Sequence, residues 1–148
     1  MAIEAPQRSD FTFFYGLRVR WSEVDPQGIV FNGNYLTYTD VATTEYYRQL
    51  DVRYPADLLA AGGDLFAVRS SLDYLAPAQY DDWLEIGVRA LRLGRSSLAF
   101  EVGIWCGERA LTRGELIYVY ADEQRNSQPL PDWLRQRILG FERVAPQA

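Results

Sequence analysis

The chain has 148 residues, 48% of them hydrophobic and 14% aromatic, so it can bury a core of ordinary domain size. Its net charge of −5 argues against a nucleic-acid partner that is bound through a broad basic patch. It contains no His, and all 15 basic residues are Arg. Within this chain, these absences exclude a Ser-His-Asp or Cys-His arrangement, imidazole-based zinc sites and a lysine Schiff base.

Other features of the composition concern location and partners. Cys106 is the single cysteine, so no intramolecular disulfide can form and nothing indicates an oxidising compartment. No signal-peptide pattern is apparent, and no apolar run approaches the roughly 20 residues that span a bilayer. We therefore predict a cytoplasmic protein with no membrane partner, no nucleic-acid partner, no metal and no cofactor.

The first predicted elements are a polar segment and a strand. Residues 1–10 are polar and predict a flexible N-terminal segment. From Phe11 to Val24 aromatic and β-branched residues are frequent. Every second residue near the middle is apolar, as in a half-buried strand: Leu17, Val19 and Trp21. Pro26 and Gly28 then end the strand.

A long helix is predicted from Asn34 to about Leu50. Apolar residues recur there at spacings of three and four, which gives one apolar face: Tyr35, Tyr38, Val41, Ala42 and Tyr46. Asn32 or Asn34 can cap its start. A short second helix is predicted over residues 54–61, because Gly62-Gly63 follows it.

The rest of the chain predicts four strands and a short helix that begins near Pro131. The strands are residues 65–76, 83–93, 97–105 and 110–121. Because the turns between most of them are short, these strands pair antiparallel. The sequence thus predicts an α+β domain over residues 11–140, with the long helix on one face of an antiparallel sheet, and a C-terminal tail at residues 141–148.

Asp25 is the best candidate for chemistry in a chain without imidazole. It begins a Pro/Gly turn seven to nine residues before the start of the helix. A loop of that length can return its carboxylate toward N–H groups near Asn32, Gly33 and Asn34, and Gly33 lets the backbone approach a substrate closely. The carboxylate can attack an activated acyl carbon or deprotonate water, while the N–H groups stabilise the oxyanion. From spacing alone, an ordinary turn-forming Asp before Pro is the more common case.

The segment Asp25-Pro26-x-Gly28-Ile29-Val30-x-x-x-Asn34-Tyr35 resembles the active-site signature of hotdog-fold acyl-CoA thioesterases of the 4-hydroxybenzoyl-CoA thioesterase family. The similarity continues through Tyr74-x-x-Pro77-Ala78-x-x-Asp81-Asp82-x-Leu84-Glu85-Ile86, Gly94-Arg95-Ser96-Ser97-Leu98 and Leu130-Pro131. The resemblance implies a hotdog fold, in which a long central helix is wrapped by a curved antiparallel sheet of about five strands. It also implies a homodimer or homotetramer with active sites at the subunit interface.

The resemblance implies that the protein hydrolyses an aromatic or short- to medium-chain acyl-CoA to the free acid and CoA. Asp25 is then the nucleophile or general base, and the backbone at Asn32 and Gly33 polarises the thioester carbonyl. Tyr35 is predicted to contact the substrate. Arg95 and Ser96, with Arg92 beside them, are predicted to bind CoA near its phosphates.

Two alternatives stay open. The thioester can be carried by an acyl carrier protein, or the domain can be a hotdog scaffold that binds acyl thioesters without turnover.

A related bacterial short-chain acyl-CoA branch has His where this chain has Asn32, so the sequence leans toward the hydroxybenzoyl branch. The hydratases and dehydratases of the same fold use a His, which this chain lacks. The acyl group itself is not readable from the sequence.

Overall fold

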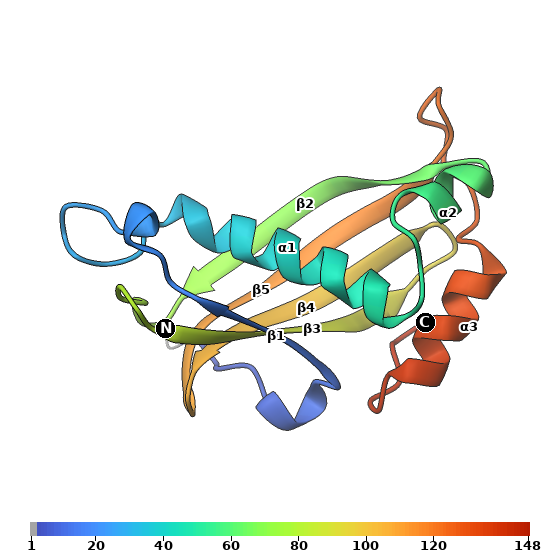
Figure 1. Cartoon of the computed structure of the whole chain (residues 1–148). Coiled ribbons are helices and arrows are strands. Elements are labelled where there is room, and N and C mark those ends of the chain that lie inside the picture. Colours follow the sequence, from blue (N-terminus) through green and yellow to red (C-terminus); the bar gives the residue numbers. More distant parts are fainter. Residues whose placement is uncertain (1–2) are drawn as a thin grey trace.

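The computed structural model describes residues 3–148, which form one antiparallel sheet, three helices and two 3-10 turns (Figure 1). The sheet has the strand order β1-β3-β4-β5-β2. Its strands are β1 (Phe13–Arg18), β2 (Asp64–Tyr74), β3 (Trp83–Leu93), β4 (Ser97–Cys106) and β5 (Arg109–Ala121). The helices are α1 (Gly33–Gln49), α2 (Ala56–Ala60) and α3 (Asp132–Phe141), and the 3-10 turns are η1 (Arg8–Asp10) and η2 (Trp21–Glu23). None of the helices within residues 3–148 is long and apolar enough to cross a membrane.

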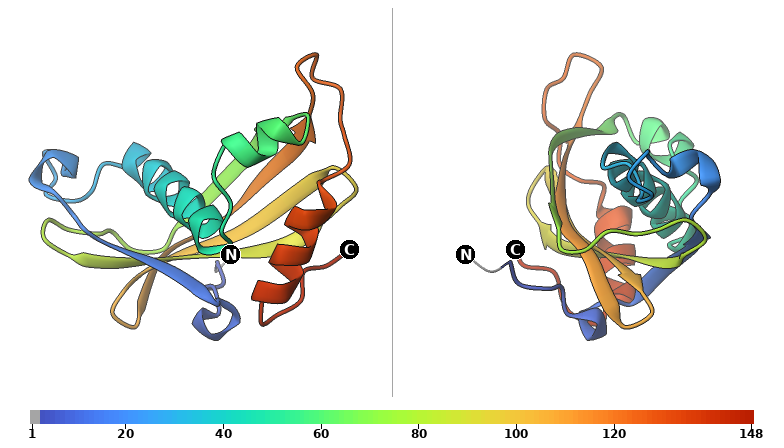
Figure 2. Two further views of the ribbon diagram at one scale, coloured as in Figure 1. Left: turned by 45° about the vertical axis from the view of Figure 1, so that its right-hand side comes forward. Right: turned by 90° about the vertical axis from the view of Figure 1, so that its left-hand side faces the viewer.

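The sheet curves around α1, so the core lies between them (Figure 2). Side chains of a strand point alternately to its two faces, and the inward-facing ones on β3 and β4 are fully buried: Leu84, Ile86, Val88, Ala90, Leu98, Phe100, Val102 and Ile104. Helix α1 covers them with Tyr35, Tyr38, Ala42 and Tyr46. The predicted α+β architecture, with the helix on one face, is confirmed.

Val41 was expected on the apolar face of α1, but 38% of its surface is exposed. Successive helical residues are rotated by about 100°, and Ala42 takes the position that faces the sheet. Val41 is therefore turned to the side of the helix.

The first strand is shorter than predicted. It ends at Arg18, after which the Val19 N–H bonds to the Asp82 carbonyl at 2.9 Å. The Glu23 carboxylate then accepts the Arg20 N–H at 2.8 Å and closes turn η2. The expected alternation fails there because this turn takes the chain off the sheet.

The predicted N-terminal segment and C-terminal tail both contact the sheet. The Arg8 guanidinium donates to the Glu85 carboxylate on β3 at 2.6 Å. The Gln147 carbonyl accepts the Leu93 N–H at 2.9 Å. Residues 1–2 lie outside the described residues, and the flexibility of the N-terminal segment stays a prediction.

Candidate active site at the start of helix α1

The segment between β1 and α1 forms a loop that is closed at its neck. The Phe31 N–H donates to the Glu23 carbonyl at 3.0 Å. Inside this neck the Asp25 N–H donates to the Ile29 carbonyl at 2.9 Å. Asp25 thus lies at the base of a small, hydrogen-bonded turn, and the chain re-enters the domain next to it.

The turn that begins at Asp25 orients one oxygen of the Asp25 carboxylate. The Gly28 N–H donates to the Asp25 carbonyl at 2.9 Å, and Gly28 has φ +82°, a conformation that favours glycine. The Oδ1 atom of Asp25 accepts the Gln27 N–H at 2.8 Å. Its Oδ2 atom has no hydrogen-bond partner among residues 3–148. The half-buried carboxylate is therefore oriented by one oxygen and free at the other.

Glu23 anchors this loop to α1. Its carboxylate accepts bonds from the Tyr38 hydroxyl at 3.0 Å and from the Arg20 Nη2 at 2.7 Å, and its carbonyl accepts the Asn34 side-chain amide at 2.9 Å. Burial alone would raise the pKa of Glu23, but the hydrogen bonds from Arg20 and Tyr38 outweigh it and lower the pKa below its usual value. Glu23 is thus an ionised link between the loop and the first two turns of the helix. This role of Glu23 was not predicted from the sequence.

The first turn of α1 presents two N–H groups without partners. The Phe31 carbonyl accepts the Asn34 N–H at 2.9 Å, and the Asn32 carbonyl accepts the Tyr35 N–H at 3.4 Å. Within residues 3–148, the N–H groups of Asn32 and Gly33 bond to nothing, as expected for the first N–H groups of a helix.

The prediction that an Asn side chain caps α1 is wrong. Asn32 occupies the cap position but has helical dihedrals (φ −57°, ψ −33°), and its side chain makes no capping bond. Capping side chains usually come from residues in an extended conformation. The side chain of Asn34 bonds to Glu23 instead.

A pocket of about 420 Å³ opens beside these groups. Asp25 and Asn32 both line it, together with Tyr35 and Tyr74. Most of its remaining wall is apolar: Ile29, Val30, Phe31, Leu75, Ala76 and Pro77. Gly33 does not line this pocket but a neighbouring groove between α1 and β2.

Tyr35 is a buried polar group at the floor of the site. Its hydroxyl oxygen accepts the Ala78 N–H at 3.0 Å. Burial raises the pKa of Tyr35, and the nearby Asp25 charge raises it further. The hydroxyl therefore stays neutral near pH 7, and its proton has no acceptor among the described residues. It can donate to a bound ligand but cannot act as a base.

Arg92, Arg95 and Ser96 lie at the other end of the sheet from Asp25. Strand β3 begins next to the site, where Trp83 pairs with Arg18, and it ends at the β3–β4 turn that carries Arg95. Its 11 residues, at about 3.3 Å each, separate the two ends by roughly 30 Å. Figure 1 shows the loop before α1 and the β3–β4 turn at opposite ends of the molecule. A single chain does not bring these residues together with Asp25.

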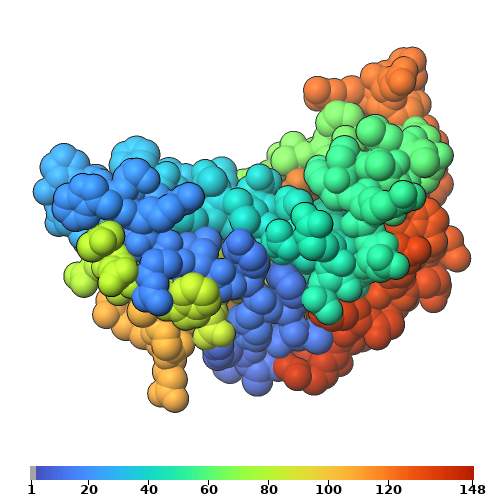
Figure 3. All heavy atoms as spheres, viewed as in Figure 1, coloured from blue at the N-terminus to red at the C-terminus, as the bar shows by residue number. Residues whose placement is uncertain are grey.

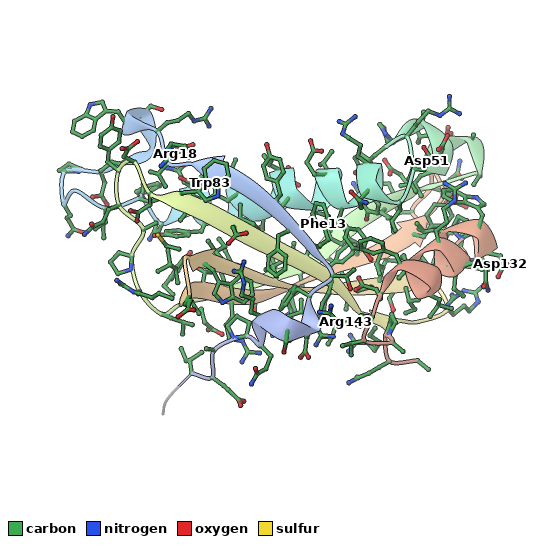
Figure 4. The ribbon with its side chains drawn as sticks, turned by 60° about the horizontal axis from the view of Figure 1, so that its bottom comes forward. Phe13, Arg18, Asp51, Trp83, Asp132 and Arg143 are labelled. Carbon is green, nitrogen blue, oxygen red and sulfur yellow. The ribbon has the colours of Figure 1, made fainter. Side chains whose placement is uncertain are left out.

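The end of the sheet nearest the site is marked in Figure 4 by Arg18 and Trp83. The Arg18 guanidinium lies 5.4 Å from the centre of the Trp83 ring, and 49% of Trp83 is exposed.

No group of three or more His, Cys, Asp or Glu side chains in residues 3–148 could hold a metal ion. The functional groups of this site are thus a carboxylate, hydroxyls and backbone N–H groups.

Such a site can catalyse acyl transfer to water. A carboxylate with one free oxygen can attack an acyl carbon or deprotonate a water molecule. N–H groups at a helix start can stabilise the oxyanion that either route forms. The class of protein that this arrangement defines is a hydrolase of activated acyl groups, on a sheet that wraps one helix.

Comparisons with known proteins agree with this class. Residues 27–113 match the family model of the Thioesterase superfamily. The chain is 30% identical over 112 residues to the acyl-CoA thioester hydrolase YbgC of Escherichia coli O6:H1, covering 74% of this chain and 82% of that protein. The structure of a thioesterase from Thermus thermophilus, complexed with coenzyme A and Zn, has a TM-score of 0.78 and 29% identity, covering 90% of this chain and 96% of the other.

A third relative shares the fold at lower identity. The 1,4-dihydroxy-2-naphthoyl-CoA thioesterase of Synechocystis has a TM-score of 0.79 and 21% identity, covering 85% of this chain and 94% of the other. This chain belongs to the thioesterase superfamily. It has the hotdog fold and is a thioester hydrolase, so the predictions of family, fold and enzyme class are confirmed.

Proposed function

We propose that this protein hydrolyses acyl-CoA thioesters and that Asp25 is its catalytic carboxylate. The observation that carries the proposal is the pocket that Asp25 and Asn32 line together, at a helix start with two unpartnered N–H groups. The name of YbgC, an acyl-CoA thioester hydrolase, and the coenzyme A in the Thermus structure support this choice of substrate.

Two routes use the same groups. In the nucleophilic route the free oxygen of Asp25 attacks the thioester carbon, the CoA thiolate leaves and is protonated, and water hydrolyses the resulting anhydride. In the general-base route Asp25 takes a proton from water as the water oxygen attacks the same carbon. The C–S bond then breaks, and the CoA thiolate leaves and takes up a proton. Both routes place negative charge on the carbonyl oxygen.

The N–H of Asn32, which lines the pocket, and the adjacent N–H of Gly33, which lines the neighbouring groove, are the proposed donors to that oxygen. Loss of one such donor typically raises the barrier by about 2.7–4 kcal/mol. The Tyr35 hydroxyl, whose proton has no acceptor among residues 3–148, is the proposed side-chain contact to the substrate. The positive end of the α1 dipole favours the same charge.

The acyl group is proposed to occupy the apolar part of the pocket. Val30, Leu75 and Pro77 supply aliphatic wall, and the rings of Tyr35 and Tyr74 supply aromatic wall. These surfaces suit an aromatic or a short- to medium-chain acyl group.

The proposed CoA contacts of Arg92, Arg95 and Ser96 require a second copy of the chain. Antiparallel pairing of two β2 strands about a two-fold axis would reverse one protomer relative to the other. The β3–β4 turn of one copy would then lie at the same end as Asp25 of the other. We therefore propose a homodimer as the smallest active unit, and the homotetramer that the sequence resemblance implies would be built from two such dimers.

Strand β2 is suited to this pairing. It is one of the two outer strands of the sheet, and residues 67–70 are exposed, Val68 by 60%. Such an edge has unpaired backbone groups that can pair with another strand. A groove between β2 and α1, also lined by Leu36, continues this surface. In Figure 3 the outline above α1 is hollowed between the loop before α1 and the region of α2.

The substrate proposal is tested by measuring thiol release from a panel of benzoyl-, phenylacetyl- and straight-chain acyl-CoA thioesters. We expect saturable turnover of at least one member. Turnover of acyl carrier protein thioesters alone would favour the carrier-protein alternative, and binding without turnover would favour the scaffold.

A cytoplasmic location stays a proposal, consistent with the free thiol of Cys106.

The two routes are distinguished by mass spectrometry of a rapidly quenched single turnover. The nucleophilic route predicts a transient acyl adduct on Asp25. The general-base route predicts none at any quench time.

A further inference from the structure

We propose that Tyr74 is a positioning residue for the oxyanion site, because its hydroxyl fixes and polarises the peptide group between Asn32 and Gly33. The inference rests on the proposed roles of Asp25 and the two N–H groups. It starts from one contact: the Tyr74 hydroxyl, at the end of β2, donates to the Asn32 carbonyl at 3.2 Å.

This contact acts on a proposed catalytic donor through the peptide plane. The Asn32 carbonyl and the Gly33 N–H belong to one planar peptide group and point in opposite directions. A bond that fixes the carbonyl therefore fixes the direction of the N–H. It also draws electron density toward the oxygen and makes the N–H a stronger donor, an effect of about 10–30% per bond.

The helix start alone holds this peptide less firmly than the preceding one. The Phe31 carbonyl, which shares its peptide with the Asn32 N–H, accepts the Asn34 N–H at 2.9 Å. The Asn32 carbonyl accepts the Tyr35 N–H only at 3.4 Å, a long hydrogen bond. The Tyr74 hydroxyl therefore supplies a second hydrogen bond to the Asn32 carbonyl, which the helix start alone holds only by a long bond.

The surroundings of Tyr74 favour a functional over a structural role. Its ring packs on the buried ring of Tyr35 with centroids 5.3 Å apart, and both rings line the pocket. Yet 52% of Tyr74 is exposed, and the Asn32 carbonyl it bonds is at the surface. Water can replace the hydroxyl bond in the resting protein, so its loss leaves no buried group unsatisfied.

The first test is Tyr74→Phe, which removes the hydroxyl and keeps the ring. The matched control is Tyr54→Phe: Tyr54 is 42% exposed, stacks on the buried Tyr47 at 5.1 Å, and its hydroxyl has no hydrogen bond in residues 3–148. We expect kcat of Tyr74→Phe to fall about tenfold, with KM within about twofold of wild type and an unchanged urea midpoint. The control should match wild type in all three.

The second test measures the bound carbonyl directly. An acyl-CoA with a ¹³C-labelled thioester carbonyl is bound to Asp25→Asn, with and without Tyr74→Phe, and its stretching frequency is recorded by difference infrared spectroscopy. We expect the frequency to be higher in the double variant, because the carbonyl is less polarised.

Unchanged kcat and an unchanged stretching frequency in the Tyr74→Phe proteins would overturn the role of Tyr74 and leave the proposed function intact. A fall in kcat matched by a lower urea midpoint and no spectral change would make Tyr74 structural, which also overturns it. Full activity of the Asp25→Asn protein would refute both the proposed function and this inference.

Discussion

Replacement of Glu23 by Ala tests whether the Asp25 loop is held by one buried carboxylate. Only 9% of Glu23 is exposed, and its carboxylate accepts the Tyr38 hydroxyl and the Arg20 N–H. Bonds to a charged acceptor contribute about 1.5–3 kcal/mol each in favourable cases, and Glu23→Ala leaves the buried Tyr38 hydroxyl unsatisfied. The Arg20 side chain is 77% exposed, so its ion pair adds at most about 1 kcal/mol. We expect a loss of roughly 3 kcal/mol in the free energy of unfolding.

The assay is urea unfolding at neutral pH, with Glu45→Ala as the control. Glu45 pairs with Arg48 on α1 at 3.0 Å in the same i, i+3 spacing, but its side chain is 30% exposed and that of Arg48 is 73% exposed. The control should lose no more than about 0.5 kcal/mol. Equal losses in the two variants would refute the reasoning, because they would make Glu23 an ordinary surface charge.

The stabilisation of the fold by Glu23 also depends on pH, and the direction of its pKa shift gives the sign of that dependence. Its folded-state pKa is lowered from the usual 4.5, so its carboxylate stabilises the fold above that pH. The contribution is lost as the pH falls through the lowered folded value. The stability difference between wild type and Glu23→Gln should therefore shrink in acid.

Three further outcomes follow from other parts of the molecule. Burial raises the pKa of Glu142 more than its bonds from Tyr46 and Ala90 lower it, so the free energy of unfolding of the wild type should fall as the pH rises from 4.5 through the raised pKa. Urea unfolding of Glu142→Gln should show a weaker dependence on pH over that range. Val68→Lys, on the exposed edge of β2, should shift the mass measured by light scattering toward the monomer and lower turnover, and an unchanged oligomer would remove β2 as the interface. Arg95→Ala should raise KM for acyl-CoA about tenfold but leave hydrolysis of a truncated acyl-pantetheine thioester unchanged, and an unchanged KM for acyl-CoA would favour the carrier-protein alternative.

Much of the fold could be predicted from local patterns. Strand β3 was predicted at Trp83–Leu93, because its alternation is regular and its ends are marked by turn residues. Helix α1 was predicted to within about one residue at each end. The first strand was overextended to Val24, because the alternation continued into η2, where the turn that Glu23 closes takes the chain off the sheet.

The site was less accessible from the sequence. Asp25 stood out because a chain without His or Lys has few other groups for chemistry, and the family resemblance then favoured catalysis over an ordinary turn role. Glu23 was missed because its role depends on Tyr38, 15 positions later, and on burial that no local pattern reveals. The one local signal was its spacing of three from Arg20, which suits a closed turn. Tyr74 was noted only as part of a motif, because its bond to Asn32 spans 42 positions.

Steady-state hydrolysis by Asp25→Asn is the most direct test of the central claim, which is that this carboxylate performs the chemistry. The substitution keeps the size of the side chain and its acceptor for the Gln27 N–H, so the loop should stay folded. We predict that kcat falls by at least about 100-fold, while the affinity for CoA measured by calorimetry stays within about twofold. An Asp25→Asn protein that retains most of its wild-type kcat would contradict the account.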